Sequence, residues 1–406
     1  AGISIAIVQL PPERQIREVG SSANSPHDFP ILDVSSTSRH VHSPNWDIQT
    51  VDPSGAGTVD LAVDGSGRPH LAYSHGDYVR HAVLDGRDWI VTDVKSSEST
   101  LLSQVGIAID MTGTPHIIYW EFPSRHKYTD FAYLRHAWLE GDEWVEETFG
   151  YDDYLWSDIV LDKLGRVHLV YSVARPPGDH YFTTEELWYA VEENGYWSVE
   201  RIDSNAGWLG GCPSIVVDNS NSPHVVYQAY TGKEDSHVLR YASKGDEKTW
   251  NVETIGRTES CPSIFLDGLN QPHIVHKTES DGPENSLLIY LHKEDDRWVG
   301  EIMVKLDLSG DQYVGCAGSI SLFLDQYERP HVAYYHWTDE DFAVKYAFRG
   351  EEGWIIDSVE SGSQGIGGYL TLALDGKDIP HLAYYRWDSW AVVYATKQEV
   401  KPHLRY

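Results

Sequence analysis

Positive charge is scarce in this 406-residue sequence. It has 31 Lys and Arg residues against 62 Asp and Glu residues, for a formal net charge of −31. Such a surface repels phosphate backbones and offers no basic stripe, which argues against nucleic acid as a partner. Long apolar runs are also missing. No stretch reaches the roughly 20 residues needed to cross a bilayer, so we expect no membrane span.

Sulfur-containing residues are few, with 2 Met and 3 Cys, whereas aromatic residues are plentiful, with 15 Trp and 25 Tyr. Rigid aromatic side chains in this number favour close packing between sheets and exclude a disordered or fibrous chain. The first residues include neither an initiator Met nor a basic segment. We therefore expect a secreted, monomeric chain whose signal peptide has been removed.

One phrase of sequence occurs seven times: an apolar run ending in Asp, a short turn, Pro-His or Val-His, two apolar residues and usually Tyr. Successive copies of its histidine are 46 to 58 residues apart, which is the spacing of propeller blades. The copies are Leu61–Tyr73, Ile107–Tyr119, Ile159–Tyr171, Ile215–Tyr227, Ile264–His276, Leu322–Tyr334 and Leu372–Tyr384. The repeat predicts an all-β, seven-bladed propeller.

Each blade reads as four antiparallel strands, A to D, from the central axis outwards. Seven strands D begin with Trp, but the first of them, at Trp46, precedes every strand A. The chain also ends its last repeat at a strand C near Tyr394. We therefore expect Trp46–Asp52 to pair with that strand and close the ring, so that no sheet edge stays open. Residues 46–406 then form the propeller, and residues 1–45 an arm across its outside or one face.

Residues that recur in all seven blades have a structural explanation, because a catalytic site is needed only once. The histidines of the repeat are expected to be buried and to hydrogen-bond to the backbone of a turn or of the neighbouring blade. The Asp that ends each strand A is expected to cap the turn that follows.

Departures from the repeat are the candidates for chemistry. In strand C, the usual Tyr-Ala becomes His81-Ala82 in the first blade and His136-Ala137 in the second. Both histidines follow an arginine, Arg80 and Arg135. This matched pair in adjacent blades predicts a shared functional site, with simple replacement of Tyr by His as the alternative.

The connections between strands B and C are the second departure, since they are long in blades 2 and 3. Long loops on a rigid scaffold commonly carry binding groups. Candidate ligand-binding residues in the connections of blades 2 to 4 are Trp120, His126, Tyr181 and Tyr230.

Two of the three cysteines, Cys212 and Cys261, occupy the same place before strand A in neighbouring blades, and Cys316 is near it in the next. Three interpretations stay open: small buried residues, a disulfide between Cys212 and Cys261, or a metal site. No cofactor is required by these residues. A structural calcium ion in or near the central channel is the metal that we would look for.

The motifs Asp-x-x-Gly-x-Pro-His, Leu-x-Tyr-Ala and Gly-x-x-Trp over residues 46–396 resemble those of the seven-bladed propeller polysaccharide lyases. These include ulvan lyases and rhamnose–glucuronate lyases, which are related to propeller rhamnosidases. The resemblance implies cleavage of the bond between rhamnose and glucuronic acid by β-elimination, with an acidic rhamnose-containing polysaccharide as the partner.

Catalysis in that family uses two histidines, a tyrosine and an arginine. The resemblance places the histidines at His116 and His136. His81, a candidate from the matched Arg-His pairs in strand C, would share proton transfer or orient the leaving sugar. The family's arginine has no counterpart at Leu187-Trp188-Tyr189. Arg135 and Arg240 are the substitutes that we propose, and Tyr230 or Tyr181 would supply the phenol.

Two other functions fit the same scaffold. A glycoside hydrolase would use paired carboxylates, although the turns here lack the Ser-x-Asp-x-Gly-x-Thr-Trp box of sialidases. A carbohydrate-binding lectin without catalysis would repeat its binding residues in every blade, whereas the loop residues here differ between blades.

Overall fold

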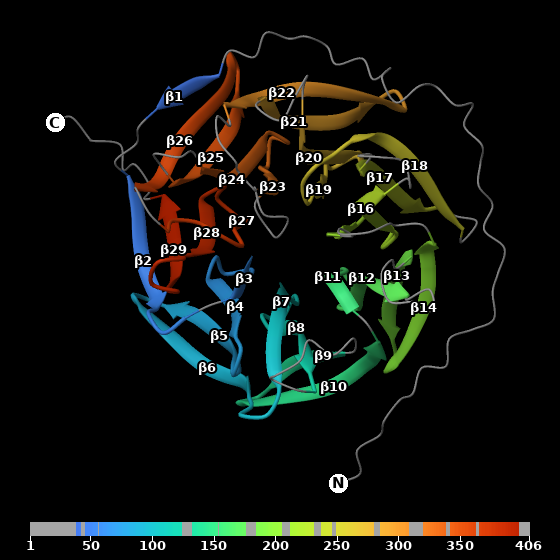
Figure 1. Ribbon diagram of the computed structural model, residues 1–406, viewed down its shortest axis with the longest axis vertical. Helices are drawn as coiled ribbons and strands as arrows, with labels where there is room; N and C mark the ends of the chain where they lie inside the picture. Colours follow the sequence, from blue (N-terminus) through green and yellow to red (C-terminus); the bar gives the residue numbers. More distant parts are fainter. Residues whose placement is uncertain are drawn as a thin grey trace.

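The computed structural model describes residues 38–41, 45–55, 57–123, 132–152, 154–175, 184–204, 212–230, 237–245, 249–279, 285–307, 320–337, 342–362 and 365–397. These residues form strands and turns only, arranged as seven sheets around a central axis (Figure 1). The predicted seven-bladed β-propeller is confirmed. No helix in the described ranges could cross a membrane.

Six blades are built from consecutive strands in the order A, B, C, D. Blade 1 contains β3 (Thr58–Val63), β4 (Pro69–His75), β5 (Tyr78–Asp85) and β6 (Asp88–Ser96), and blade 2 contains β7 (Leu101–Ile109), β8 (Pro115–Phe122), β9 (Ala132–Glu140) and β10 (Glu143–Asp152). Blade 3 contains β11 (Tyr154–Leu161), β12 (Val167–Arg175), β13 (Thr184–Glu193) and β14 (Tyr196–Asp203), and blade 4 contains β15 (Ser214–Val217), β16 (Pro223–Tyr230), β17 (His237–Lys244) and β18 (Trp250–Arg257). Blade 5 contains β19 (Ser263–Leu266), β20 (Pro272–Glu279), β21 (Asn285–Glu294) and β22 (Arg297–Asp307), and blade 6 contains β23 (Ile320–Leu324), β24 (Pro330–Trp337), β25 (Phe342–Gly350) and β26 (Gly353–Gly362).

Blade 7 joins the two ends of the chain. It contains β27 (Thr371–Leu374), β28 (Pro380–Tyr385) and β29 (Val392–Lys397), and its outer strand is β2 (Trp46–Asp52). Gln49 lies opposite Tyr394 in the antiparallel register, as the repeat predicts. The short β1 (Arg39–Val41) adds a parallel fifth strand to the outer edge of blade 6 (Figure 1). The rest of the predicted arm lies outside the described residues.

The antiparallel strands give the propeller two distinct faces. The A–B and C–D turns lie on one, which we call the turn face. The B–C and D–A connections lie on the other, the loop face. All seven A–B turns use the Asp that ends strand A: in blade 1, Asp64 Oδ1 accepts the N–H groups of Ser66 and Arg68, both at 2.9 Å. The expected capping role of this Asp is confirmed.

The blades are joined near the axis by bonds between neighbouring strands A. Asp60 Oδ2 accepts the Ile107 N–H of the next blade at 2.9 Å, and Asp158 Oδ2 accepts the Ile215 N–H at 3.0 Å. Serine takes this role later in the ring, where Ser263 Oγ accepts the Leu322 N–H at 3.1 Å. Polar side chains on the inner strands thus pair with backbone groups that would otherwise lack partners.

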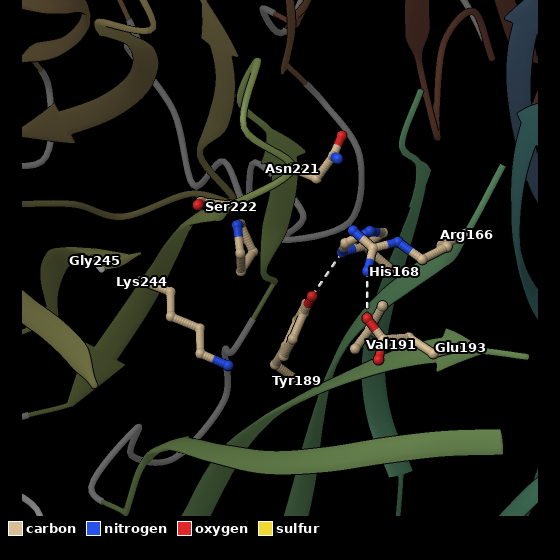
Figure 2. Close-up of a pocket in the computed structure, with 10 residues that line it drawn as sticks. Arg166, His168, Tyr189, Val191, Glu193, Asn221, Ser222, Lys244 and Gly245 are labelled. Atoms are coloured by element: carbon tan, nitrogen blue, oxygen red, sulfur yellow. Dashed lines mark hydrogen bonds and ion pairs between the residues drawn. The ribbon is translucent and has the colours of Figure 1, made fainter. Parts of the chain in front are cut away.

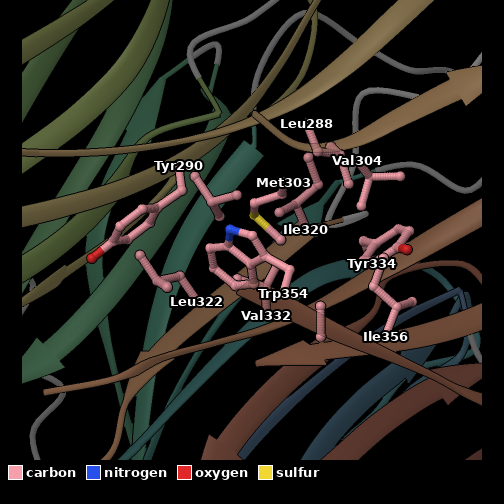
Figure 3. Packing of buried hydrophobic residues seen from close by; sticks show 12 residues of the cluster. Leu288, Tyr290, Met303, Val304, Ile320, Leu322, Val332, Tyr334, Trp354 and Ile356 are labelled. Carbon is pink, nitrogen blue, oxygen red and sulfur yellow. The ribbon is translucent and has the colours of Figure 1, made fainter. Parts of the chain in front are cut away.

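Further out, aromatic and aliphatic side chains fill the space between blades. Trp354, at the start of β26, is 1% exposed and lies in a cluster with Tyr290 of blade 5. Figure 3 shows this cluster, with Met303 beside the indole ring. A buried Trp side chain removes more apolar area from water than an aliphatic one, so Trp354 makes a large contribution to the packing energy between the two sheets.

Candidate functional site

The histidines of the repeat each bind the strand C residue of the same blade. In blade 4, His224 Nδ1 lies 2.5 Å from the Tyr241 hydroxyl, and His224 Nε2 faces Asp218 at 3.8 Å. In blade 6, His331 Nε2 lies 3.3 Å from Asp325. Because the imidazole directs its Nε2–H toward the turn carboxylate, Nδ1 accepts the hydrogen bond from the phenol. The prediction that these histidines are hydrogen-bonded parts of the framework is confirmed, but the predicted backbone partners are wrong. The partners are side chains of the same blade, namely a strand C residue and the turn carboxylate.

The same strand C residue packs against the Trp that begins strand D of the next blade. The rings of Tyr241 and Trp298 meet edge to face with centroids 5.4 Å apart. Equivalent contacts occur at all seven junctions, and they are Tyr189–Trp250, Tyr241–Trp298, Tyr290–Trp354, Tyr346–Trp46, Tyr394–Trp89, His81–Trp144 and His136–Trp197. A repeated tyrosine, or histidine in two blades, is therefore part of the packing between blades.

His81 and His136 occupy this tyrosine position in blades 1 and 2. His81 is 5% exposed and binds His70 at 3.0 Å, while His136 is 4% exposed and binds His116 at 3.1 Å. Burial and the neighbouring imidazole lower the pKa of His81 to about 3 and that of His116 to about 4. The two predicted catalytic histidines thus lie in two separate junctions between blades, and their catalytic role stays a prediction without support from this arrangement.

The arginines expected to bind a uronate are already paired with carboxylates. Arg80 donates to Asp52 at 2.9 Å and to Asp93 at 2.8 Å. Arg240 donates to Asp203 at 2.5 Å. Asp52 and Asp203 belong to the preceding blade and also accept a tyrosine hydroxyl, so each of these contacts fastens two blades together.

Arg135 follows the same rule within its own blade, where it binds Glu121 at 2.7 Å. Trp120 was placed in a loop by the sequence, but it lies in strand β8, is 4% exposed and donates to Ser157 Oγ at 3.1 Å. Burial removes its ring from any sugar-stacking role. His126 and Tyr181 lie outside the described residues, as does the side chain of Tyr230 in strand β16.

Among the described side chains, no group of three or more His, Cys, Asp or Glu residues is placed to hold a metal ion. Two carboxylates, Asp60 and Asp158, are partly exposed on the innermost strands. Burial and the charge of Asp60 raise the pKa of Asp158 to about 7, and burial also raises the pKa of Asp60. The calcium ion expected near the channel remains a prediction.

Cys212 and Cys261 form a disulfide with an S–S distance of 2.06 Å and a Cα–Cα distance of 5.0 Å. The bond joins the connections that enter strands β15 and β19, so it links blades 4 and 5. Of the three interpretations left open by the sequence, the structure therefore selects the disulfide. Cys316 lies outside the described residues.

The loop face carries an exposed aromatic cluster between blades 7 and 1. Trp387 is 51% exposed and Trp390 is 47% exposed, although both are large apolar side chains. The Tyr385 ring lies 5.1 Å from the ring of Trp387 and is stacked at 6.2 Å on that of Trp390. His75 of blade 1, itself exposed, lies 6.2 Å from the Trp390 ring. We call these four residues the aromatic platform.

The backbone beneath the platform is shaped to hold it. A Cβ added at Gly368 would lie 2.7 Å from the Tyr385 ring, and one at Gly367 would lie 2.2 Å from the ring of Tyr335. Trp390 has a φ of +58°, a left-handed conformation that is uncommon for a bulky residue. Such strain persists only where the surroundings enforce it, so the platform is preorganised rather than a chance exposure of two tryptophans.

An exposed apolar patch with polar groups at its edge is typical of a ligand-binding surface. Tyr78, next to His75 in the first-blade hairpin, donates its hydroxyl to the Gly55 carbonyl at 2.7 Å, and burial raises its pKa. Arg386 precedes Trp387 and binds Glu360 at 2.5 Å. The platform thus combines stacking surfaces with one exposed imidazole, and the Tyr78 phenol lies beside it. Sequence reasoning missed it, although two Trp residues within Arg386–Trp390 are a departure from the repeat that could have been noticed.

The comparisons with known proteins bear on the fold. No protein-family model matches the chain, and no curated protein matches it. Among solved structures, an ulvan lyase bound to an oligosaccharide of GlcA and Rha3S is similar at 12% identity and a TM-score of 0.57, over 86% of this chain and 95% of that one. A protein of unknown function from Dyadobacter fermentans is similar at 9% identity and a TM-score of 0.52, over 87% and 99% of the two chains. At these identities the likeness establishes the propeller fold alone.

Proposed function

We propose that this protein is a carbohydrate-active propeller whose oligosaccharide substrate lies across the aromatic platform, and that it cleaves a rhamnose–glucuronate linkage by β-elimination outside the cell. The observation that carries the proposal is the exposure of Trp387 and Trp390 beside an exposed imidazole. Aromatic rings pack well against the apolar faces of pyranose rings, and exposed ones are otherwise costly in contact with water. The oligosaccharide held by the structurally similar ulvan lyase supports the choice of substrate.

The reaction assigns a proton acceptor and a proton donor. A histidine can accept and return protons near neutral pH, so His75 would take the proton from C5 of the glucuronate. The electrons of that C–H bond form a C4–C5 double bond while the bond from C4 to the departing oxygen breaks. Tyr78 would protonate this oxygen, and to do so its hydroxyl must turn away from the Gly55 carbonyl to which it donates in the structure. The rings of His75 and Tyr78 are in tilted contact, with centroids 6.0 Å apart, so a sugar bound over their exposed edges could reach both side chains.

The test separates binding from chemistry. Replacing Trp387 and Trp390 by Ala should weaken binding of a rhamnose–glucuronate oligosaccharide at least about tenfold, because two stacking contacts are lost. Replacing His75 by Ala should lower the rate of unsaturated-uronate release about 100-fold and leave the affinity nearly unchanged. Tyr196→Ala is the matched control, since Tyr196 is 80% exposed but lies on the outer strand β14. Equal effects of the platform and control variants would refute the proposal.

A second candidate is a lectin that binds the same glycan without cleaving it. It is favoured by the pairing of Arg80, Arg135 and Arg240 with carboxylates, because elimination needs the uronate carboxylate to be neutralised. Calorimetric titration that shows platform-dependent binding, with no ultraviolet-absorbing product on long incubation, would select the lectin.

A further inference from the structure

A pocket of about 200 Å³ opens on the turn face, at the junction of blades 3 and 4 (Figure 2). It lies on the opposite face of the propeller from the aromatic platform. Blade 3 contributes Arg166, Tyr189 and Glu193, and blade 4 contributes Asn221, Pro223 and Lys244. Drug-sized ligands need roughly 300–1,000 Å³, so this pocket suits a smaller molecule.

The pocket lies where a contact between blades is missing. The fourth residue of each A–B turn has a positive φ, and in four blades it is not glycine. In three of these, its side chain accepts an N–H of the preceding blade's turn. The contacts are Asn270 Oδ1 with the Asn219 N–H at 3.1 Å, Glu328 Oε1 with the Gly268 N–H at 3.1 Å, and Asp378 Oδ1 with the Gln326 N–H at 3.0 Å.

Asn221 is the fourth case and departs from the other three. Its Oδ1 atom is buried and accepts no hydrogen bond from any residue within the described part of the chain. The Lys163 side chain of blade 3 instead reaches Asn219, at 2.5 Å. A buried acceptor without a partner destabilises the folded chain, so a ligand that donates a hydrogen bond to it removes an unfavourable contribution.

The charged groups of the pocket are balanced. Arg166 binds Asp162 at 2.6 Å. It also pairs with Glu193, as Figure 2 shows. Lys244 binds Glu200 at 2.7 Å. An anionic ligand would have to displace one of these carboxylates, and a cationic one would meet two fixed positive charges. The lining thus favours a neutral ligand with hydroxyl donors.

We propose that this pocket binds an uncharged polyhydroxyl ligand of the size of one monosaccharide, which bridges blades 3 and 4. Asn221 Oδ1 is buried in the structure, so the amide turns toward the pocket on binding, and a ligand hydroxyl then donates to Oδ1 in place of the missing backbone N–H. The apolar sides of the sugar ring pack against Val191 and Pro223, which also line the pocket. The inference rests on the pocket alone and does not depend on the function proposed for the platform.

The experiment uses the full chain with Trp387 and Trp390 replaced by Ala, so that the platform makes no contribution. Methyl α-L-rhamnopyranoside is the probe, methyl glucuronoside is its anionic counterpart, and ligand-observed NMR with titration measures binding. Asn221→Gly removes the acceptor and suits the φ of +61°. Asn270→Gly is the matched control, because its φ of +64° is the same within error but it lies at another junction.

We expect Asn221→Gly to weaken binding of the neutral glycoside at least tenfold and Asn270→Gly to leave it unchanged. Asn221→Asp, which keeps an acceptor oxygen, should retain binding within about threefold. The inference is overturned if the glycoside does not bind, if Asn221→Gly binds it as well as the parent, or if both glycine variants lose binding equally. Preference for the glucuronoside would overturn the ligand class.

Discussion

Protonation of Asp158 should control part of the stability of the ring. Its carboxylate accepts backbone N–H groups on strand A, yet burial and Asp60 raise its pKa from 3.8 to about 7. A carboxyl group with a raised pKa binds a proton more tightly in the folded state than in the unfolded state. Its favourable effect is therefore fully present below pH 4 and is lost as the pH rises from about 4 to about 7.

The size of the effect follows from this pKa difference. A difference of about three between the folded and unfolded pKa values of Asp158 would correspond to about 4 kcal/mol of stability. Asp158 is partly exposed on the inner strand, however, and solvent reduces the cost of its charge. About 2 kcal/mol is the value that we expect. Serine fills the equivalent position in later blades, where Ser263 and Ser321 accept the same kind of N–H. Asp158→Ser thus removes the charge and keeps an acceptor for Ile215.

Denaturant unfolding of the natural chain and of Asp158→Ser, at pH values from about 4 to about 8, measures this term. The variant should be more stable by about 2 kcal/mol near pH 8, and this advantage should disappear near pH 4. The reverse change, Ser263→Asp, should introduce a similar loss of stability at high pH. A difference between Asp158→Ser and the natural chain that does not change with pH would refute the reasoning.

Three further predictions concern the framework. His81→Tyr introduces the residue that five other blades use, so the variant should fold and keep any activity. It should also lose less stability than the natural chain as the pH falls below about 6.5, because histidine in the unfolded state takes up a proton there. A folded variant without turnover would instead assign His81 to catalysis. His224→Ala should lower the free energy of unfolding by about 1–3 kcal/mol through the lost bond to Tyr241, and a change below about 0.5 kcal/mol would contradict a structural role. Deleting residues 1–52 should expose the edge of β29 and cause aggregation, whereas unchanged melting and solubility would contradict closure by β2.

The fold was predictable because the repeat encodes it several times over. Seven copies of one phrase fix the number of blades, and the mismatch between the first Trp and the last strand C fixes the closure at Trp46–Asp52. The turn Asp and the strand B histidine could be assigned because a sevenfold occurrence excludes a single catalytic use. The structure identifies the hydrogen-bond partner of each histidine, such as Tyr241 for His224, which the spacing of residues in the sequence does not reveal.

The candidate site was less predictable because a departure in residue type need not be a departure in role. His81 and His136 replace tyrosine but make the same two contacts, one to the strand B histidine and one to the Trp of the next blade. Sequence gives no measure of exposure within a strand. Loop length does not indicate the Trp pair at 387 and 390, because these residues lie in a short connection and only the structure shows that they are exposed.

A common constraint links the platform and the pocket. Many polar side chains at the described junctions already have partners within the ring: Arg80 and Arg240 pair with carboxylates, His224 binds a phenol, and Asp60 and Asp158 accept backbone N–H groups. Such groups cannot be withdrawn for a ligand without loosening two blades at a cost of a few kcal/mol. Ligand sites on this scaffold must therefore use groups left over from the repeat. The exposed indoles at Trp387 and Trp390 and the unsatisfied amide oxygen of Asn221 are leftovers of that kind, so binding at either place would leave the contacts that hold the blades together intact.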